Sequence, residues 1–246
     1  MTARIVIYPT PDLLAAGTAA RLITTLVDIQ ATGGIPGIAL TGGGVGTKML
    51  VAINESSARD AVDWSKVDIF WGDERFVPSA DPDRNSRQAR DALLDHIPVD
   101  PARVHVMAAS DGEFGADVDA AAAAYAEVIA GREPLDLVML GMGDEGHVAS
   151  IFPTSPAVYD TRPVVAVRDC PKPPPTRISL TLPTIRQAAE VWIITAAASK
   201  ADAVATALGG AAEADLPAAG ATGRSRTLWL LDAESASALS PAAAGR

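Results

Sequence analysis

Short apolar runs alternate with longer segments of helical periodicity along this chain. Short apolar runs bounded by turn signals predict buried strands, and apolar positions spaced three or four residues apart predict helices. The predicted strands cover residues 5–8, 37–40, 67–71, 104–107, 135–140, 164–167, 177–182, 191–195 and 227–231. The predicted helices cover residues 11–30, 46–54, 85–94, 117–130, 199–208 and 233–239. Because strands that alternate with helices pair in parallel, we predict an α/β protein with a single open, mostly parallel twisted sheet flanked by helices.

The proline-rich segment PKPPPT, residues 171–176, could divide the chain into two domains. Proline is not accommodated inside a helix, so this segment is predicted to be a stiff loop. A predicted strand resumes directly after it. We therefore interpret the loop as an ordered crossover within a single domain that spans residues 1–246.

Composition and charge narrow the range of partners. The formal net charge of −10 disfavours a nucleic-acid partner, although a local group of arginines could still bind a small anion. Cys170 is the only cysteine, which excludes an intrachain disulfide and a cysteine-based zinc site. No pair of histidines has the spacing of metal ligands, so we expect no metal. No apolar run approaches the ~20 residues that span a bilayer, and the N-terminus lacks a signal-peptide pattern, so we expect a cytoplasmic protein with no membrane partner.

The first candidate loop is TGGGVGTK, residues 41–48, which follows a predicted strand and begins a predicted helix. Such a turn exposes backbone N–H groups at a helix N-terminus, where a phosphate binds well. Gly42, Gly43 and Gly44 are therefore candidate substrate-binding residues. The loop is not a Walker A motif, because Lys48 follows the threonine instead of preceding it. A glycine-rich turn without a ligand is the alternative interpretation.

The second candidate loop is WGDERFVP, residues 71–78, where a buried strand ends in three adjacent charges. Ligands of open α/β sheets bind beyond the carboxyl ends of the strands, so Asp73 and Arg75 are candidate site residues. Asn85 belongs to a following polar segment that could fold back over the site. A solvated turn with a local ion pair would produce the same residues.

The third candidate is LGMGDEGHVASIFP, residues 140–153, which contains the glycine spacing GxGxxG of a dinucleotide site. That site needs a crossover helix, and a crossover takes about a dozen residues or more. Pro153 and Pro156 leave no room for one. We therefore expect the glycines to make a sharp turn that presents His147, which Glu145 could orient and make more basic.

Two later cations and two other histidines complete the set of candidate residues. Lys200 begins a predicted helix directly after a strand, where its charge opposes the helix dipole unless an anion binds there. Arg177 opens the strand after the proline loop. His96 at a helix end and His105 within a short strand are explained by exposure and packing.

The segments WGDERFVP, LGMGDEGHVASIFP, PKPPPTRISLTLPTI and ASKAD occur in an order that resembles the glucosamine-6-phosphate deaminase/6-phosphogluconolactonase family, and specifically its lactonases. The ending LWLLDAESASAL is also similar to that family's C-terminal segment, so the resemblance covers essentially the whole chain. It implies the fold shared by glucosamine-6-phosphate deaminase and ribose-5-phosphate isomerase. It further implies a cofactor-free hydrolase that converts 6-phospho-D-glucono-1,5-lactone to 6-phosphogluconate in the oxidative pentose phosphate pathway. The expected partner is that small phosphorylated sugar lactone, and the expected oligomeric state is a monomer.

The resemblance also implies roles for individual residues. His147 matches the histidine that activates water as a general base, and Asp73 matches an acid of the same site. Arg75 matches a substrate-contacting arginine. Arg177 and Lys200 match residues that hold the sugar phosphate.

This sequence departs from the family pattern at two places. The family usually has aspartate where Glu145 stands, so the longer side chain must bend or shift to reach the same partner. The family loop SGGSTP reads TGGGVG here, so phosphate contacts are expected from backbone N–H groups, with Thr41 or Thr47 as candidate helpers.

Two other functions remain compatible with the sequence. A sugar-phosphate isomerase or deaminase could use the same fold, and a test on glucosamine 6-phosphate would separate it from the lactonase. A non-catalytic sugar-phosphate sensor is the second alternative, although such sensors carry a DNA-binding segment for which this acidic chain has no spare length.

Overall fold

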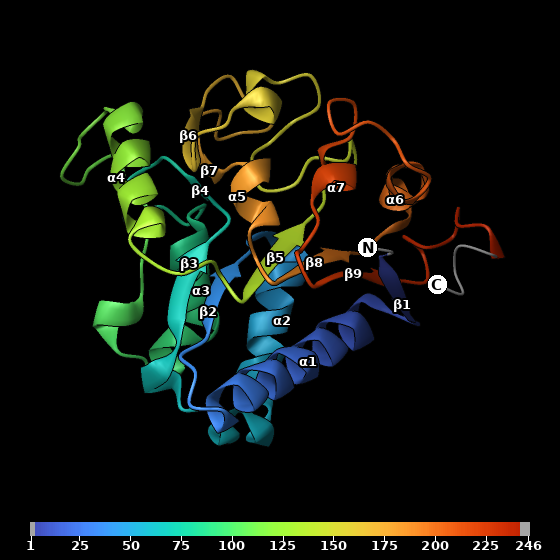
Figure 1. Ribbon diagram of the computed structural model, residues 1–246, viewed down its shortest axis with the longest axis horizontal. Coiled ribbons are helices and arrows are strands. Elements are labelled where there is room, and N and C mark those ends of the chain that lie inside the picture. The colour runs from blue at the N-terminus through green and yellow to red at the C-terminus, as the bar shows by residue number, and fades with distance from the viewer. Residues whose placement is uncertain (1–2, 242–246) are drawn as a thin grey trace.

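The structure is a computed structural model that describes residues 3–241. Its main sheet has six strands, all parallel, in the order β1-β9-β8-β5-β2-β3 (Figure 1). These strands are β1 (Arg4–Tyr8), β2 (Gly37–Leu40), β3 (Asp68–Trp71), β5 (Leu137–Gly141), β8 (Glu190–Thr195) and β9 (Arg226–Asp232). The prediction of an α/β protein with a mostly parallel sheet is confirmed.

Helices cover both faces of this sheet (Figure 1). One face packs against α1 (Pro11–Ala31), α2 (Gly43–Glu55) and α3 (Asn85–Ala92). The other face is covered by α4 (Val118–Ala130), α5 (Leu182–Arg186), α6 (Ala201–Leu208) and α7 (Pro217–Gly220). Short 3-10 turns lie at Ser57–Ala61, Trp64–Lys66, Leu94–His96, Pro101–Arg103, Pro156–Tyr159 and Ala198–Lys200.

The central strand β5 explains why both faces need cover. Its side chains alternate, so that Leu137 and Met139 enter the core under α1 and α2. Val138 and Leu140 enter the core on the opposite face. All four are at most 1% exposed. A continuous apolar run is therefore what a strand buried on both faces requires.

A second, three-stranded antiparallel sheet was not predicted. It has the order β4-β7-β6, with β4 (Asp73–Arg75), β6 (Val164–Val167) and β7 (Arg177–Leu180). The proline segment joins β6 to β7, which pair antiparallel, so it is a hairpin connection and the predicted crossover was wrong. Short apolar runs predict a strand but not the direction of its partner, which is why the error arose.

Three predicted elements also differ from the structure. Residues 104–107 form only a single bridge, from Val104 to Ile69. Residues 233–239 make a series of turns, because the Asp232 carboxylate accepts the N–H of Ser235 at 2.8 Å and ties the chain back. The strand predicted over 177–182 ends early, because Leu182 and Pro183 begin α5.

The carboxyl ends of the parallel strands lie at one edge of the main sheet, because parallel neighbours run in the same direction. The glycine loop follows β2, the GDER segment follows β3, the histidine turn follows β5, and Lys200 follows β8. The fold thus brings all of these candidate segments to one edge. Within residues 3–241, no helix is long and apolar enough to cross a membrane.

Candidate active site

A cavity of about 220 Å³ opens at this edge of the sheet. Most of the predicted site residues line it, namely Gly42, Gly43, Gly44, Asp73, Arg75, Asn85, His147 and Lys200. Lys172 also lines it and was not predicted. Glu145 and Arg177 stand behind the wall, in contact with residues that form it.

The glycine loop forms the N-terminus of α2. Gly43 begins the helix with a φ of +81°, a conformation that glycine adopts readily. A Cβ atom on Gly42 would lie 1.9 Å from Oδ1 of Asn85, so only glycine fits there. Among the described residues, no side chain caps the first N–H groups of α2. These groups stand at the positive end of the helix dipole and suit an anion.

The two acids of the GDER segment lie in different surroundings, because successive side chains of β4 point to opposite faces of the strand. Glu74 is 1% exposed, and its two carboxylate oxygens accept the N–H groups of Asn85 at 2.7 Å and Ser86 at 2.8 Å. The guanidinium of Arg84 lies 3.7 Å from the same carboxylate. Glu74 therefore caps α3. Sequence reasoning missed this role, although the alternation of a strand would have placed Glu74 opposite its neighbours.

Asp73 faces the cavity side of β4. It accepts a 2.6 Å hydrogen bond from the hydroxyl of Ser150, and Nδ2 of Asn85 donates to its backbone carbonyl at 2.9 Å. The Oδ1 atom of Asn85 is buried and has no hydrogen-bond partner within residues 3–241. Asn85 thus packs against Gly42 and ties the glycine loop to Asp73.

A tight turn after β5 presents His147. The N–H of Gly143 donates to the carbonyl of His147 at 3.0 Å, and Met142 bridges to Val148. A Cβ on Gly143 would lie 2.1 Å from the imidazole ring. The chain makes turns after Gly146, as predicted, and does not enter the crossover helix of a dinucleotide site.

Glu145 reaches the histidine despite the different side-chain length. Its Oε1 lies 3.2 Å from Nδ1 of His147, and its Oε2 accepts a 2.8 Å hydrogen bond from Lys172. Burial lowers the pKa of His147, and Lys172 lowers it further, although Glu145 and Asp73 favour the charged form. Burial opposes ionisation of Glu145, but the hydrogen bond from Lys172, a backbone hydrogen bond and the charges of His147 and Lys172 together outweigh it, so the pKa of Glu145 lies below its ordinary value. The site therefore favours a neutral imidazole beside an ionised carboxylate.

Lys200 lies at the opposite side of the histidine turn, at the N-terminus of α6. Its ammonium donates to the carbonyl of Met142 at 2.6 Å. Burial lowers its pKa, while the nearby Asp144 acts in the opposite direction. A cation partly withdrawn from water and placed at a helix N-terminus is suited to an anionic ligand.

Arg177 is 4% exposed and does not line the cavity. Its guanidinium donates to the carbonyls of Pro174 and Lys172, both at 3.0 Å, and of Pro173 at 3.3 Å. These bonds direct Nε and Nη2 into the proline loop, while Nη1 donates to Oγ of Ser150 at 3.5 Å and lies 3.9 Å from the Asp73 carboxylate. The structure thus places this predicted phosphate ligand behind the cavity wall, as a brace for the loop that carries Lys172.

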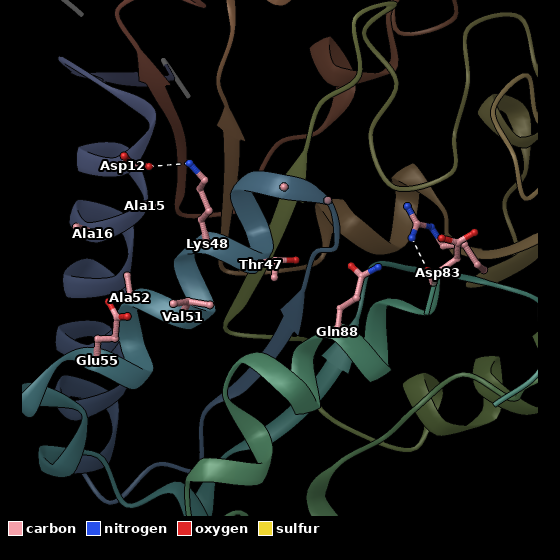
Figure 2. Close-up of a pocket in the computed structure, with 13 residues that line it drawn as sticks. Asp12, Ala15, Ala16, Thr47, Lys48, Val51, Ala52, Glu55, Asp83 and Gln88 are labelled. Atoms are coloured by element: carbon pink, nitrogen blue, oxygen red, sulfur yellow. Dashed lines mark hydrogen bonds and ion pairs between the residues drawn. The ribbon is translucent and has the colours of Figure 1, made fainter. Parts of the chain in front are cut away.

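A larger groove of about 740 Å³ adjoins the cavity and shares Gly43, Gly44 and Arg75 with it. Figure 2 shows α1 on one side, with Asp12, α2 in the middle, with Lys48, and Gln88 and Asp83 on the other side. The ammonium of Lys48 lies 2.7 Å from the Asp12 carboxylate. This ion pair joins the two helices beside the groove.

The other two histidines lie away from the cavity. His105 stacks on Phe70 at 4.4 Å, and His96 is partly exposed, with Nε2 3.1 Å from the carbonyl of Asp91. In the part of the chain that the structure describes, no three His, Cys, Asp or Glu side chains gather as a metal site would require.

Fold and site together define a parallel α/β protein with a histidine-containing cavity at the carboxyl edge of its sheet. Residues 9–229 match the family described as glucosamine-6-phosphate isomerases/6-phosphogluconolactonase, and the chain belongs to this family.

Similar proteins and structures agree with this assignment. A Streptomyces coelicolor protein named 6-phosphogluconolactonase is 54% identical over 97% of this chain and 95% of its own length. A Mycobacterium tuberculosis protein of the same name is 50% identical over 97% of this chain and 99% of its own length. The structure of 6-phosphogluconolactonase from Trypanosoma brucei superposes with a TM-score of 0.84 at 28% identity, covering 97% of this chain and 99% of that one. A monomeric glucosamine-6-phosphate deaminase shares the fold, with a TM-score of 0.82 at 20% identity over 96% of this chain and 99% of the other.

Proposed function

We propose that this protein hydrolyses 6-phospho-D-glucono-1,5-lactone to 6-phosphogluconate, a step of the oxidative pentose phosphate pathway. The observation that carries the proposal is the cavity in which His147 faces the glycine N-terminus of α2 and Lys200. Relatives named 6-phosphogluconolactonase that are at least half identical over nearly the whole chain support it.

The phosphate is proposed to bind at the cationic wall of the cavity. The N–H groups of Gly43 and Gly44 supply hydrogen-bond donors at the helix N-terminus, and Lys200 and Arg75 supply positive charge. Anchoring the phosphate there holds the lactone carbonyl near His147. Positioning of this kind removes much of the entropic barrier to the reaction.

His147 is proposed to act as the general base. With a proton on Nδ1 facing Glu145, the neutral imidazole has a free lone pair on Nε2. Nε2 takes a proton from water while the water oxygen bonds to C1, which gives a tetrahedral intermediate. The bond from C1 to the ring oxygen then breaks, and the proton on Nε2 passes to that oxygen. The new carboxylic acid loses its proton to solvent, which leaves 6-phosphogluconate and the neutral histidine.

Glu145 and Asp73 are proposed to position this machinery. The Glu145 carboxylate lies 3.2 Å from Nδ1, where its charge favours the tautomer with the proton on that nitrogen. Asp73 accepts hydrogen bonds from the hydroxyl of Ser150 and from Nδ2 of Asn85. These bonds fix the part of the cavity wall that Asp73 and Asn85 form. In this mechanism the chain's own side chains and water suffice, as is reasonable for an activated ester.

The test is a lactonase assay on freshly generated 6-phosphogluconolactone, corrected for spontaneous hydrolysis. We expect saturable turnover, and a loss of about 10²–10⁴-fold in kcat for His147→Ala, the usual contribution of a general base. The variant should still bind 6-phosphogluconate, because its phosphate contacts are intact. Near-normal kcat in the variant would refute the base assignment. Release of ammonia from glucosamine 6-phosphate, without lactone hydrolysis, would favour the deaminase instead.

A further inference from the structure

The loop between β6 and β7 places Lys172 at the cavity, and the mechanism above does not use it. We propose that Lys172 is a positioning residue that clamps Glu145 against His147 and keeps the imidazole uncharged, with Arg177 fixing the loop that carries it. This inference rests on the proposed function, because it concerns the state of the histidine that acts as base. It concerns a residue to which neither the sequence motifs nor the proposed mechanism gives a role.

The geometry is a relay through one carboxylate. Lys172 donates to Oε2 of Glu145 at 2.8 Å, and Oε1 of the same carboxylate lies 3.2 Å from Nδ1 of His147. Exposure of the three side chains falls along this relay, from 43% for Lys172 through 32% for Glu145 to 14% for His147. The relay thus reaches from the mouth of the site to the buried base.

Glutamate makes the clamp necessary. Its side chain has one more rotatable bond than aspartate, so holding its carboxylate in a single place costs more conformational entropy. A hydrogen bond from a cation to one oxygen leaves the other oxygen 3.2 Å from Nδ1 of His147. Lys172 therefore restricts the conformational freedom that the longer side chain brings.

Charge balance follows from the same contacts. Among the described residues, the charges that act on His147 are those of Glu145 on its own turn, Lys172 on the β6–β7 loop and Asp73 on β4, while Lys200 and Arg75 line the same cavity. Both carboxylates favour the imidazolium, and the ammonium of Lys172 opposes it. Without Lys172, two acids and no cation in this group would act on the ring. Its pKa would then rise toward the range in which the base is lost by protonation.

Arg177 fixes the lysine in space. It donates to the backbone carbonyl of Lys172 itself and to those of the next two prolines, and it is buried. The guanidinium of Arg177 lies 5.7 Å from the centre of the Phe152 ring. The Phe152 ring in turn packs on the imidazole of His147, with 4.4 Å between the ring centres. The same arginine therefore braces both the loop and the wall behind the histidine.

The test compares Lys172→Met and Lys172→Arg with Lys66→Met as the matched control. Lys66 is an exposed lysine that precedes β3, at the opposite edge of the sheet. The first readout is the lactonase pH profile between pH 5 and 7.5. In Lys172→Met we expect the acidic limb of kcat to move to higher pH, with kcat at pH 5.5 falling about threefold to tenfold further than at pH 7.5. Lys172→Arg should restore the wild-type limb, and Lys66→Met should not move it.

A second readout does not depend on activity. NMR titration of the His147 ring, assigned by its loss in His147→Ala, should give a higher pKa in Lys172→Met than in the wild type. An unchanged titration would overturn the inference whatever the enzyme's substrate is. An unmoved pH profile with KM raised tenfold would also overturn it and make Lys172 a direct substrate ligand. Absence of lactonase activity in the wild type, with the NMR shift present, would refute the proposed function and leave the relay standing.

Discussion

Oε1 of Glu145 lies 3.2 Å from Nδ1 of His147, so the glutamate reaches the imidazole at the position where the family usually has aspartate. The carboxylate and the ring belong to one tight turn, closed by the bond from the N–H of Gly143 to the carbonyl of His147. Backbone geometry therefore sets their separation, and the side chain adapts to it. This contact has consequences that can be measured.

Glu145→Gln should move the acidic limb of the pH profile in the direction opposite to Lys172→Met. Burial already holds the pKa of His147 below its ordinary value of about 6.5, while the negative charge of Glu145 raises it. Removing that charge lowers the pKa further, so the base stays neutral to lower pH and activity persists there. At pH 7.5 kcat should fall about tenfold, because the amide has one acceptor oxygen for the two groups Lys172 and Nδ1 of His147 and so orients the ring less well. Glu145→Asp is the control and should keep most activity. If the acidic limb of Glu145→Gln moved to higher pH, the conclusion that the charge of Glu145 raises the pKa of His147 would be wrong.

Gly143→Ala should inactivate the enzyme without unfolding it. The added Cβ would lie 2.1 Å from the imidazole, which must then leave its place. A shift of about 1 Å in a catalytic group costs on the order of 10²-fold in kcat. Gly131→Ala, at the C-terminal end of α4, is the matched control. Circular dichroism should be unchanged in both, and a Gly143→Ala enzyme with normal kcat would show that the imidazole does not act from its place against Gly143.

Glu74→Ala should lower the free energy of unfolding rather than change the chemistry directly. Its carboxylate accepts two N–H groups at the start of α3 and neutralises the buried Arg84. Deleting it leaves buried donors and a buried charge unpaired, at an expected cost of about 3–5 kcal/mol. Urea unfolding measures this loss. Glu74→Gln, which keeps one acceptor, should lose less, and a change below about 1 kcal/mol in Glu74→Ala would argue against the capping role.

Local patterns were enough to predict the parallel sheet and the loops that carry His147, Asp73 and Lys200. Each lies just beyond an apolar run, and parallel strands bring such positions to one edge. The contact between Lys172 and Glu145 escaped prediction, because it joins residues 27 positions apart through the hairpin of β6 and β7. The antiparallel sheet was missed for the same reason: an apolar run does not encode the direction of its partner. The bonds from Arg177 to the loop carbonyls follow from that same hairpin.

Lys200 and Arg177 were both predicted to hold the phosphate, and the structure separates them. Lys200 lines the cavity, whereas the donors of Arg177 are directed to loop carbonyls and to Ser150 behind the wall. Lys200→Met should therefore weaken binding of 6-phosphogluconate by about 10–100-fold, the contribution of a hydrogen bond to a charged group. The difference in affinity between this variant and the wild type should shrink as salt is raised, because salt screens the attraction between Lys200 and the phosphate in the wild type. Arg177→Met should change that affinity less than Lys200→Met does, while lowering kcat and moving the acidic limb as Lys172→Met does, since the loop loses its brace. Calorimetric titration of both variants with the product, at two salt concentrations, makes the comparison. Equal losses of affinity would show that Arg177 reaches the phosphate after all, and would require the proline loop to rearrange when ligand binds.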